Sequence, residues 1–178
     1  ALPILPGTEG SSYTTFRNST AYKDRPSMIY VGANDGMLHG FRASDGVELL
    51  AYVPNAVYPG LSALTAQNYG LSHRYFVDGA VRALDARVNG AWKTVVLGTL
   101  GGGGKAVMAL DATDPAGFNT GNVMWEFNDA GGNDMGHSYP QATVVRLASN
   151  QWAAVIANGY NSVSGKAVLY LVKIGRAH

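Results

Sequence analysis

The chain has 178 residues, of which 47% are hydrophobic and 14% charged, so it can bury a substantial core and is too apolar for a disordered polymer. Its formal net charge of +1 offers no field that would attract nucleic acid or an anionic membrane. Without any cysteine, the sequence excludes disulfides, thiolate metal sites and thiol nucleophiles. No run approaches the roughly 20 apolar residues of a membrane span.

Residues 1–25 contain Ser, Thr and Gly without clear periodicity, and we expect a lead-in segment or a remnant of a preceding strand there. From this point to the end, residues 26–178 are expected to form one partial domain. The β-rich run at 28–32 ends at an Asn-Asp-Gly turn, after which 37–41 resumes the strand pattern. An apolar run at 47–53 follows a second Asp-Gly turn. These segments predict a meander of three antiparallel strands.

The same order of features returns in the middle of the chain. A strand pattern led by Trp92 passes through the glycine run 101–104 to a returning strand at 105–110. The segment 122–127 then adds an outer strand. This unit has the three strands and the turn of the first meander.

A third unit follows. The segment 142–147 predicts an inner strand before a strand led by Trp152, and 166–172 returns after another glycine-rich turn. Hairpins in the three units start about 60 residues apart, a period that fits four-stranded propeller blades with extra loops. The prediction is an all-β, incomplete β-propeller of about two and a half to three blades of antiparallel four-stranded sheets. Because propellers close with roughly 4–8 blades, we expect a fragment of a longer protein.

Motifs for nucleotide binding and acyl transfer are incomplete. A phosphate-binding loop would need Gly at position 99 and a hydroxyl at position 106, where the chain has Thr99 and Ala106. Residues 136–140 do not match the Gly-x-Ser-x-Gly pattern of a nucleophilic serine, because Pro140 occupies the position of the last Gly. His137 beside Ser138 is the best catalytic pair by default, but no third group can be assigned to it.

The spacing of the histidines matches no helical or short zinc-ligand pair; they are His39, His73, His137 and His178. His39 is expected to be a packed or surface imidazole in a strand. Residues 128–134 offer oxygen ligands for calcium, although Gly131 breaks the EF-hand order, and a plain turn between blades is the favoured interpretation. We therefore assign no catalytic, cofactor-binding or metal residue. No cofactor is expected in this chain, and calcium stays an option for the parent protein.

Two roles are expected for the aromatic residues. Trp92 and Trp152 recur at equivalent repeat positions, which predicts that they pack between blades rather than bind ligands. Four tyrosines fall in predicted loops, where they can supply contact area to a partner: Tyr58, Tyr69, Tyr139 and Tyr160.

Several short sequence segments occur together, in an order that matches a known protein family. The chain resembles the C-terminal propeller of the PilC/PilY type IV pilus biogenesis and adhesin family over roughly residues 26–174. The phrases that carry the resemblance are 30–41, 43–46, 75–79, 92–96, 103–115, 125–127 and 157–161. The chain departs from the family at 80–81, where the family usually has a Thr-Pro or similar pair. Quinoprotein-like propellers share the Asp-Gly and Ala-Leu-Asp patterns, so the predicted fold is also quinoprotein-dehydrogenase-like.

The resemblance implies a non-enzymatic module at the bacterial cell surface, pilus tip or outer membrane, reached through the periplasm. Implied partners are pilus subunits or minor pilins and surface or host receptors, with no nucleic acid and no membrane span. We expect the loops at 54–74 and 128–139 to be presented to these partners. The alternative is a propeller fragment of a quinoprotein dehydrogenase with a pyrroloquinoline quinone cofactor. The missing cysteines weaken it, because such enzymes commonly stack a vicinal disulfide on the quinone.

Overall fold

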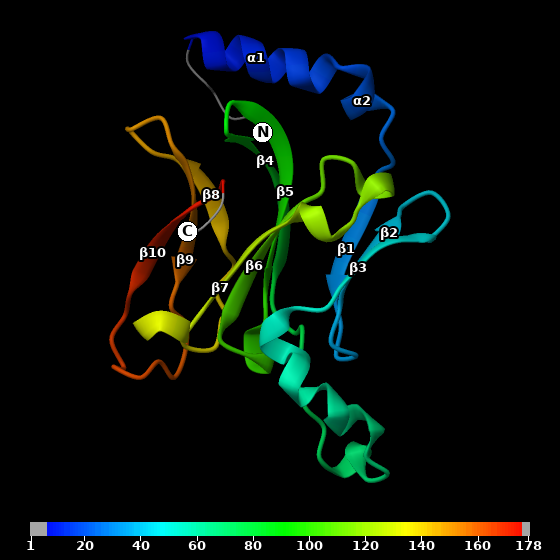
Figure 1. Cartoon of the computed structure of the whole chain (residues 1–178), viewed down its shortest axis with the longest axis vertical. Helices are drawn as coiled ribbons and strands as arrows, with labels where there is room; N and C mark the ends of the chain where they lie inside the picture. Colours follow the sequence, from blue (N-terminus) through cyan, green and yellow to red (C-terminus); the bar gives the residue numbers. More distant parts are fainter. Residues whose placement is uncertain (1–6, 176–178) are drawn as a thin grey trace.

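The computed structural model describes residues 7–175, which fold into two N-terminal helices and three antiparallel sheets (Figure 1). The helices are α1 (Gly7–Asn18) and α2 (Thr20–Lys23). The first sheet has the order β1 (Met28–Gly32), β2 (Leu38–Arg42), β3 (Glu48–Tyr52). The second contains β4 (Val81–Val88), β5 (Ala91–Thr99), β6 (Ala106–Asp111) and β7 (Val123–Asn128). The third contains β8 (Thr143–Arg146), β9 (Trp152–Ala157) and β10 (Leu169–Lys173).

Short 3₁₀ segments fill the connections between strands. They are η1 (Asn55–Thr65), η2 (Tyr69–Leu71), η3 (Gly101–Gly103), η4 (Pro115–Gly117), η5 (Thr120–Asn122) and η6 (Ala130–Gly132). No helix within residues 7–175 is both long enough and apolar enough to cross a membrane.

The hairpins follow the turn residues of the sequence. In the β1–β2 connection, Asp35 accepts a hydrogen bond from the backbone N–H of Met37 at 2.9 Å, and Gly36 has a φ of 99°. The β4–β5 hairpin turns on Asn89 and Gly90, which have φ values of 49° and 84°. Positive φ at both central residues is the geometry that joins antiparallel strands with the correct twist.

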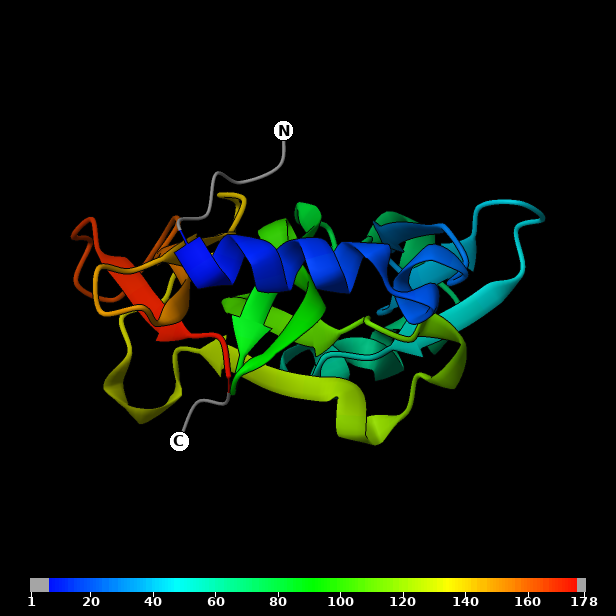
Figure 2. The same ribbon diagram turned by 90° about the horizontal axis from the view of Figure 1, so that it is seen from above.

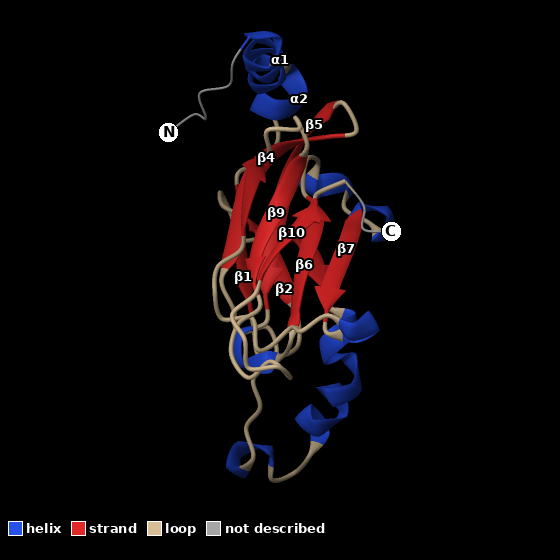
Figure 3. Cartoon of the chain, turned by 90° about the vertical axis from the view of Figure 1, so that its left-hand side faces the viewer, coloured by secondary structure: helices blue, strands red, loops and turns tan. Residues whose placement is uncertain are grey.

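The three sheets pack face to face and do not merge into one. One buried cluster joins the first and second sheets and includes Leu38, Leu50, Val77, Met108 and Leu110. The other joins the second and third sheets and includes Trp92, Trp125, Met135, Trp152 and Ile174. Because β4 contacts both β1 and β8, successive sheets are arranged about their inner strands, and the predicted propeller architecture is confirmed (Figure 3). Within residues 7–175, the second sheet has four strands, and the first and third have three each.

The two repeated tryptophans meet between the second and third sheets. The rings of Trp92 and Trp152 are edge to face, with centroids 5.4 Å apart and planes at 75°. Both residues are 8% exposed. This arrangement is a favourable one for aromatic pairs, and it confirms the prediction that these tryptophans are core residues of the blade interface.

Of the two alternatives expected for residues 1–25, a lead-in segment or a strand remnant, the strand is wrong for the described part, because residues 7–18 and 20–23 are helical. Helix α1 lies across the end of the second and third sheets (Figure 2). Tyr13 of α1 is buried against Trp92, with ring centroids 4.6 Å apart, and its hydroxyl donates to Asp85 at 2.8 Å. Burial, together with this bond to Asp85, raises the pKa of Tyr13 to about 12. The helix is therefore part of the folded core.

Helix α1 is also fixed to both tryptophans by hydrogen bonds. The indole N–H of Trp92 donates to the hydroxyl of Ser12 at 3.0 Å, and that of Trp152 donates to the carboxylate of Glu9 at 3.1 Å. Glu9 is 7% exposed and forms an ion pair with Arg146. Since buried polar groups need partners, the helix completes the hydrogen bonding of the blade interface.

His39 lies on the central strand of the first sheet and is held between two carboxylates. Its Nδ1 lies 2.5 Å from Oε1 of Glu48, and its Nε2 lies 3.0 Å from Oδ2 of Asp35. The hydrogen bond to Glu48 raises the pKa of His39, the partial burial of the ring opposes this, and Asp35 adds to the rise. A raised pKa in the folded state means that protonated His39 stabilises the fold below the unfolded pKa of about 6.5.

We expect this stabilisation to be fully present below about pH 6.5 and to be lost as the pH rises through the folded pKa of His39. The difference in melting temperature between the parent and His39→Gln should therefore be largest near pH 6 and shrink toward pH 9. Melting followed by circular dichroism across this range measures it. A difference that stays constant with pH would show that His39 contributes only packing.

Candidate interaction surface

Several of the connecting loops lie at the end of the sheets opposite helix α1 (Figures 1 and 3). This end carries the 54–74 loop, the glycine turn at 101–104, and the 128–139 segment. The two loops named from sequence as presented segments therefore lie on the same end of the molecule. Whether they contact a partner stays a prediction.

Three exposed tyrosines lie at this end and are here called the tyrosine surface: Tyr75, Tyr139 and Tyr160. They are 55%, 57% and 73% exposed, respectively. Tyr75 and Tyr139 border the same backbone position, since a Cβ on Gly102 would lie 3.1 Å from Cδ2 of Tyr75 and 3.3 Å from the hydroxyl of Tyr139. Tyr160 is joined to the same segment by a β-bridge with His137. Residues from three different connections thus form one surface.

The other two loop tyrosines have different environments. Tyr58 is 68% exposed and lies in η1. Tyr69 is half-buried, and its hydroxyl donates to the carbonyl oxygen of Arg74 at 3.1 Å. His73 packs between Tyr69 and Tyr75, with ring centroids 5.6 and 5.4 Å away. Tyr69 therefore stabilises its own loop through this packing.

Tyr75 is not among the loop tyrosines predicted to contact a partner; in the sequence it is the first residue of the 75–79 segment that carries the family resemblance. The sequence feature that could have identified Tyr75 is its position two residues after His73 and immediately before Phe76 and Val77, which are buried. An exposed aromatic residue next to a buried pair points outward from an anchored backbone.

The structure gives Ser138 a structural role. The side chain is 1% exposed, and its hydroxyl donates to the carbonyl oxygen of Ala106 at 2.6 Å and accepts the N–H of Leu100 at 2.9 Å. Both bonds fix the glycine turn to the segment that carries Tyr139. The backbone of His137 meanwhile pairs with Tyr160. His137 and Ser138, the default catalytic candidates, thus support the tyrosine surface. The remaining histidine, His178, lies outside the described residues.

The 128–134 loop folds as a side-chain-capped turn. The side chain of Asn128 accepts the N–H of Ala130 at 2.9 Å, and Gly131 has a φ of 70°. Hydrogen bonds from the hydroxyl and N–H of Ser164 hold the pKa of Asp134 below its usual value. Among residues 7–175, no three His, Asp or Glu side chains are placed to bind a metal ion. The loop oxygens of Asn128 and Asp134 accept hydrogen bonds from the loop backbone and from Ser164.

The glycine turn packs directly on the backbone of the preceding loop. A Cβ on Gly103 would lie 1.7 Å from the carbonyl oxygen of Phe76 and 2.6 Å from its Cα. The carbonyl of Leu100 also accepts the N–H of Asp78 at 3.2 Å. This close approach holds the backbone next to Tyr75 against the glycine turn.

Antiparallel sheets packed face to face about their inner strands define this chain as a β-propeller module. A family model described as the PilY1 beta-propeller domain matches residues 1–177. The chain belongs to this family.

Similar proteins agree with this assignment. The chain is 45% identical over 175 residues to the type IV pilus biogenesis factor PilY1 of Pseudomonas aeruginosa strain PAO1, covering 98% of this chain and 14% of that protein. It is 42% identical over 170 residues to a PilY1 homolog of Xylella fastidiosa, covering 96% of this chain and 11% of the homolog. The crystal structure of the P. aeruginosa PilY1 C-terminal domain matches with a TM-score of 0.73 and 42% identity, over 92% of this chain and 31% of that one. The chain thus spans only a small part of each curated relative.

Proposed function

We propose that this chain is a non-enzymatic module of a type IV pilus biogenesis protein and that its tyrosine surface contacts a pilus component or a surface receptor. The observation that carries the proposal is the convergence of Tyr75, Tyr139 and Tyr160 on one exposed end of the propeller. The relatives named as pilus biogenesis factors support the pilus setting. A location at the cell surface or on the pilus belongs to the same proposal.

The physical properties of these residues suit a contact surface. Tyrosine presents a large amphipathic area and loses little conformational entropy on binding, because only two side-chain torsions are fixed. Binding energy at protein interfaces concentrates in a few such aromatic residues. The bonds of Ser138 and the close packing of Gly103 hold the surface in place before a partner arrives.

The non-enzymatic part of the proposal is supported by the chemistry of the two default candidates. The hydroxyl of Ser138 is buried and used by the backbone, so it is not available as a nucleophile. Membership of the pilus family favours this function over the quinoprotein dehydrogenase alternative.

The test uses Tyr139→Ser combined with Tyr160→Ser in the intact protein. We expect surface attachment that depends on pili to fall about tenfold or more, since each hot-spot tyrosine contributes about 2 kcal/mol to binding. Both side chains are mostly exposed, so the melting temperature should change little. Attachment and piliation assays measure the effect.

Val47→Ser is the control, because Val47 is also exposed but lies in the turn between β2 and β3, outside the tyrosine surface and the presented loops. It should leave attachment unchanged. Normal attachment and normal piliation in the double variant would contradict the proposed role of this surface.

A further inference from the structure

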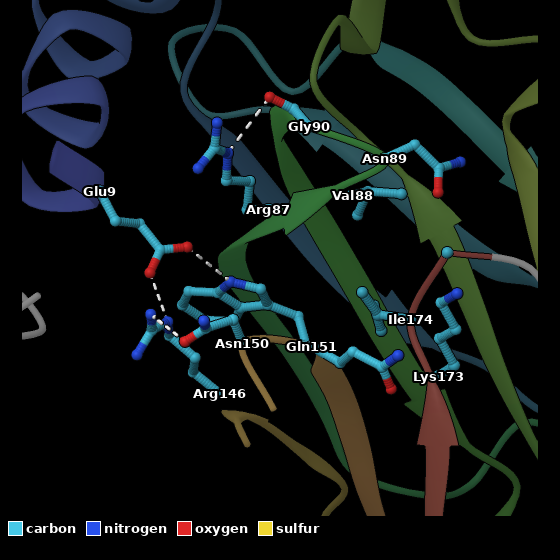
Figure 4. A pocket seen from close by; sticks show the side chains of 12 residues that line it. Glu9, Arg87, Val88, Asn89, Gly90, Arg146, Asn150, Gln151, Lys173 and Ile174 are labelled. Atoms are coloured by element: carbon cyan, nitrogen blue, oxygen red, sulfur yellow. Dashed lines mark hydrogen bonds and ion pairs between the residues drawn. The ribbon is translucent and has the colours of Figure 1, made fainter. Parts of the chain in front are cut away.

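A cavity of about 430 Å³ lies beside helix α1, and Figure 4 shows the side chains that line it. Helix α1 is at the end of the sheets opposite the loops that carry the tyrosine surface (Figure 1). It is bounded by helix α1, the β4–β5 hairpin, the turn between β8 and β9, and the end of β10. We call it the cationic cavity. Its volume falls within the range of sites that bind small organic molecules.

The side chains around this cavity carry an excess of positive charge. Arg87, Arg146 and Lys173 line it, against the single carboxylate of Glu9. Arg146 is neutralised by its ion pair with Glu9 and also donates to the side chain of Asn150 at 2.6 Å. Arg87 and Lys173 then account for an excess of about two positive charges.

Glu9 is not available to neutralise these two residues. One of its carboxylate oxygens accepts the indole N–H of Trp152, and the other pairs with Arg146 (Figure 4). Arg87 donates from Nε to the carbonyl of Gly90 at 3.2 Å, and neither Arg87 nor Lys173 has an ion pair within residues 7–175. The guanidinium of Arg87 therefore keeps donors for a ligand.

We propose that the cationic cavity binds the phosphate group of a small phosphorylated molecule, with Arg87 and Lys173 as its charge partners. A phosphate monoester carries about −1.5 to −2 charges near pH 7, which matches the excess in the cavity, whereas a carboxylate would balance only half of it. The guanidinium fork of arginine suits phosphate oxygens, and lysine supplies a compact point charge.

The size and the rim of the cavity favour a phosphate ester over the free ion. A single phosphate occupies only a small part of about 430 Å³. The remaining rim carries the amide side chains of Asn89, Asn150 and Gln151, which can donate to and accept from the hydroxyl groups of an organic body. A polar phosphate ester would therefore balance the positive charge of the cavity and form hydrogen bonds with the amide side chains of its rim.

Titration calorimetry on the intact protein in a buffer of low ionic strength tests the site with glycerol phosphate, inorganic phosphate and acetate. We expect glycerol phosphate to bind most tightly, inorganic phosphate more weakly and acetate not measurably. Equal affinity for glycerol phosphate and inorganic phosphate would also support the phosphate site, and would identify the free ion as its ligand. Acetate binding as tight as phosphate, or no phosphate binding, would overturn the proposal.

The double variant Arg87→Gln plus Lys173→Gln should weaken phosphate binding at least tenfold. The single variant Lys173→Gln should weaken it severalfold. Lys173 is exposed on β10, so the single variant keeps the fold. Arg82→Gln is the matched control, because Arg82 is an exposed arginine of β4 outside the cavity. Unchanged affinity in the double variant, or equal loss in Arg82→Gln, would also overturn the assignment.

Discussion

Replacing Trp152 with alanine is expected to lower the free energy of unfolding of the propeller by about 3–5 kcal/mol. The substitution removes a buried ring from its edge-to-face contact with Trp92 and leaves a cavity between the second and third sheets. It also removes the N–H donor to the carboxylate of Glu9, a residue that is 7% exposed. Urea unfolding of the intact protein, followed by far-ultraviolet circular dichroism, measures the change in the transition of the propeller.

Trp152→Phe separates the two contributions. Phenylalanine keeps an aromatic ring beside Trp92 but has no donor for Glu9, so we expect it to cost about 1–2 kcal/mol from the lost bond and a smaller additional amount from the lost volume. An alanine variant no less stable than the phenylalanine variant would contradict the role assigned to Trp152 in the blade interface.

Gly103→Ala is expected to destabilise the loop end by about 3 kcal/mol, at the upper end of the usual cost of overpacking. The new Cβ would lie 1.7 Å from the backbone oxygen of Phe76, and no side-chain rotation can relieve an overlap between a Cβ and a backbone atom. The glycine turn must therefore move away from the Phe76 backbone. A lower melting temperature and faster proteolysis of the 101–104 turn would report this movement.

The control for this prediction is Gly70→Ala. A Cβ on Gly70 meets nothing within 4 Å, and its backbone is not in the left-handed region. The substitution should change stability by less than about 0.5 kcal/mol. Equal melting temperatures for the two alanine variants would show that the close approach at Gly103 is not rigid.

Local sequence patterns were enough to predict the positions of most of the strands. Alternation bounded by Asn, Asp and Gly located the first meander within one residue, because these residues adopt the turn geometry without help from the rest of the chain. The start of β10 was placed three residues early. There the side chain of Asn158 accepts the N–H of Val168 and donates to the carbonyl of Lys166, so these residues form a loop.

The candidate surface was predictable only in part. Tyr139 and Tyr160 could be assigned to loops from sequence, but their common surface with Tyr75 depends on the β-bridge between His137 and Tyr160 and on the packing at Gly102. These contacts join segments distant in the chain, and no local period encodes them. The cationic cavity has the same origin, since four separate elements supply its lining.

Local sequence preferences were enough to predict the turns and the tryptophan positions, because each depends on neighbouring residues. The predicted repeat was shifted by one strand in the first unit, because Met28 begins the inner strand β1, whereas Trp92 and Trp152 lie on the second strands β5 and β9. Strand β4 and helix α1 depend on contacts between segments distant in the chain. Strand β4 carries Arg82, Asp85 and Arg87, which obscure a strand pattern, and Asp85 finds its partners on the N-terminal helices. Helix α1 contains glycines, serines and threonines that favour helix weakly, so its stability depends on the blade interface on which it packs.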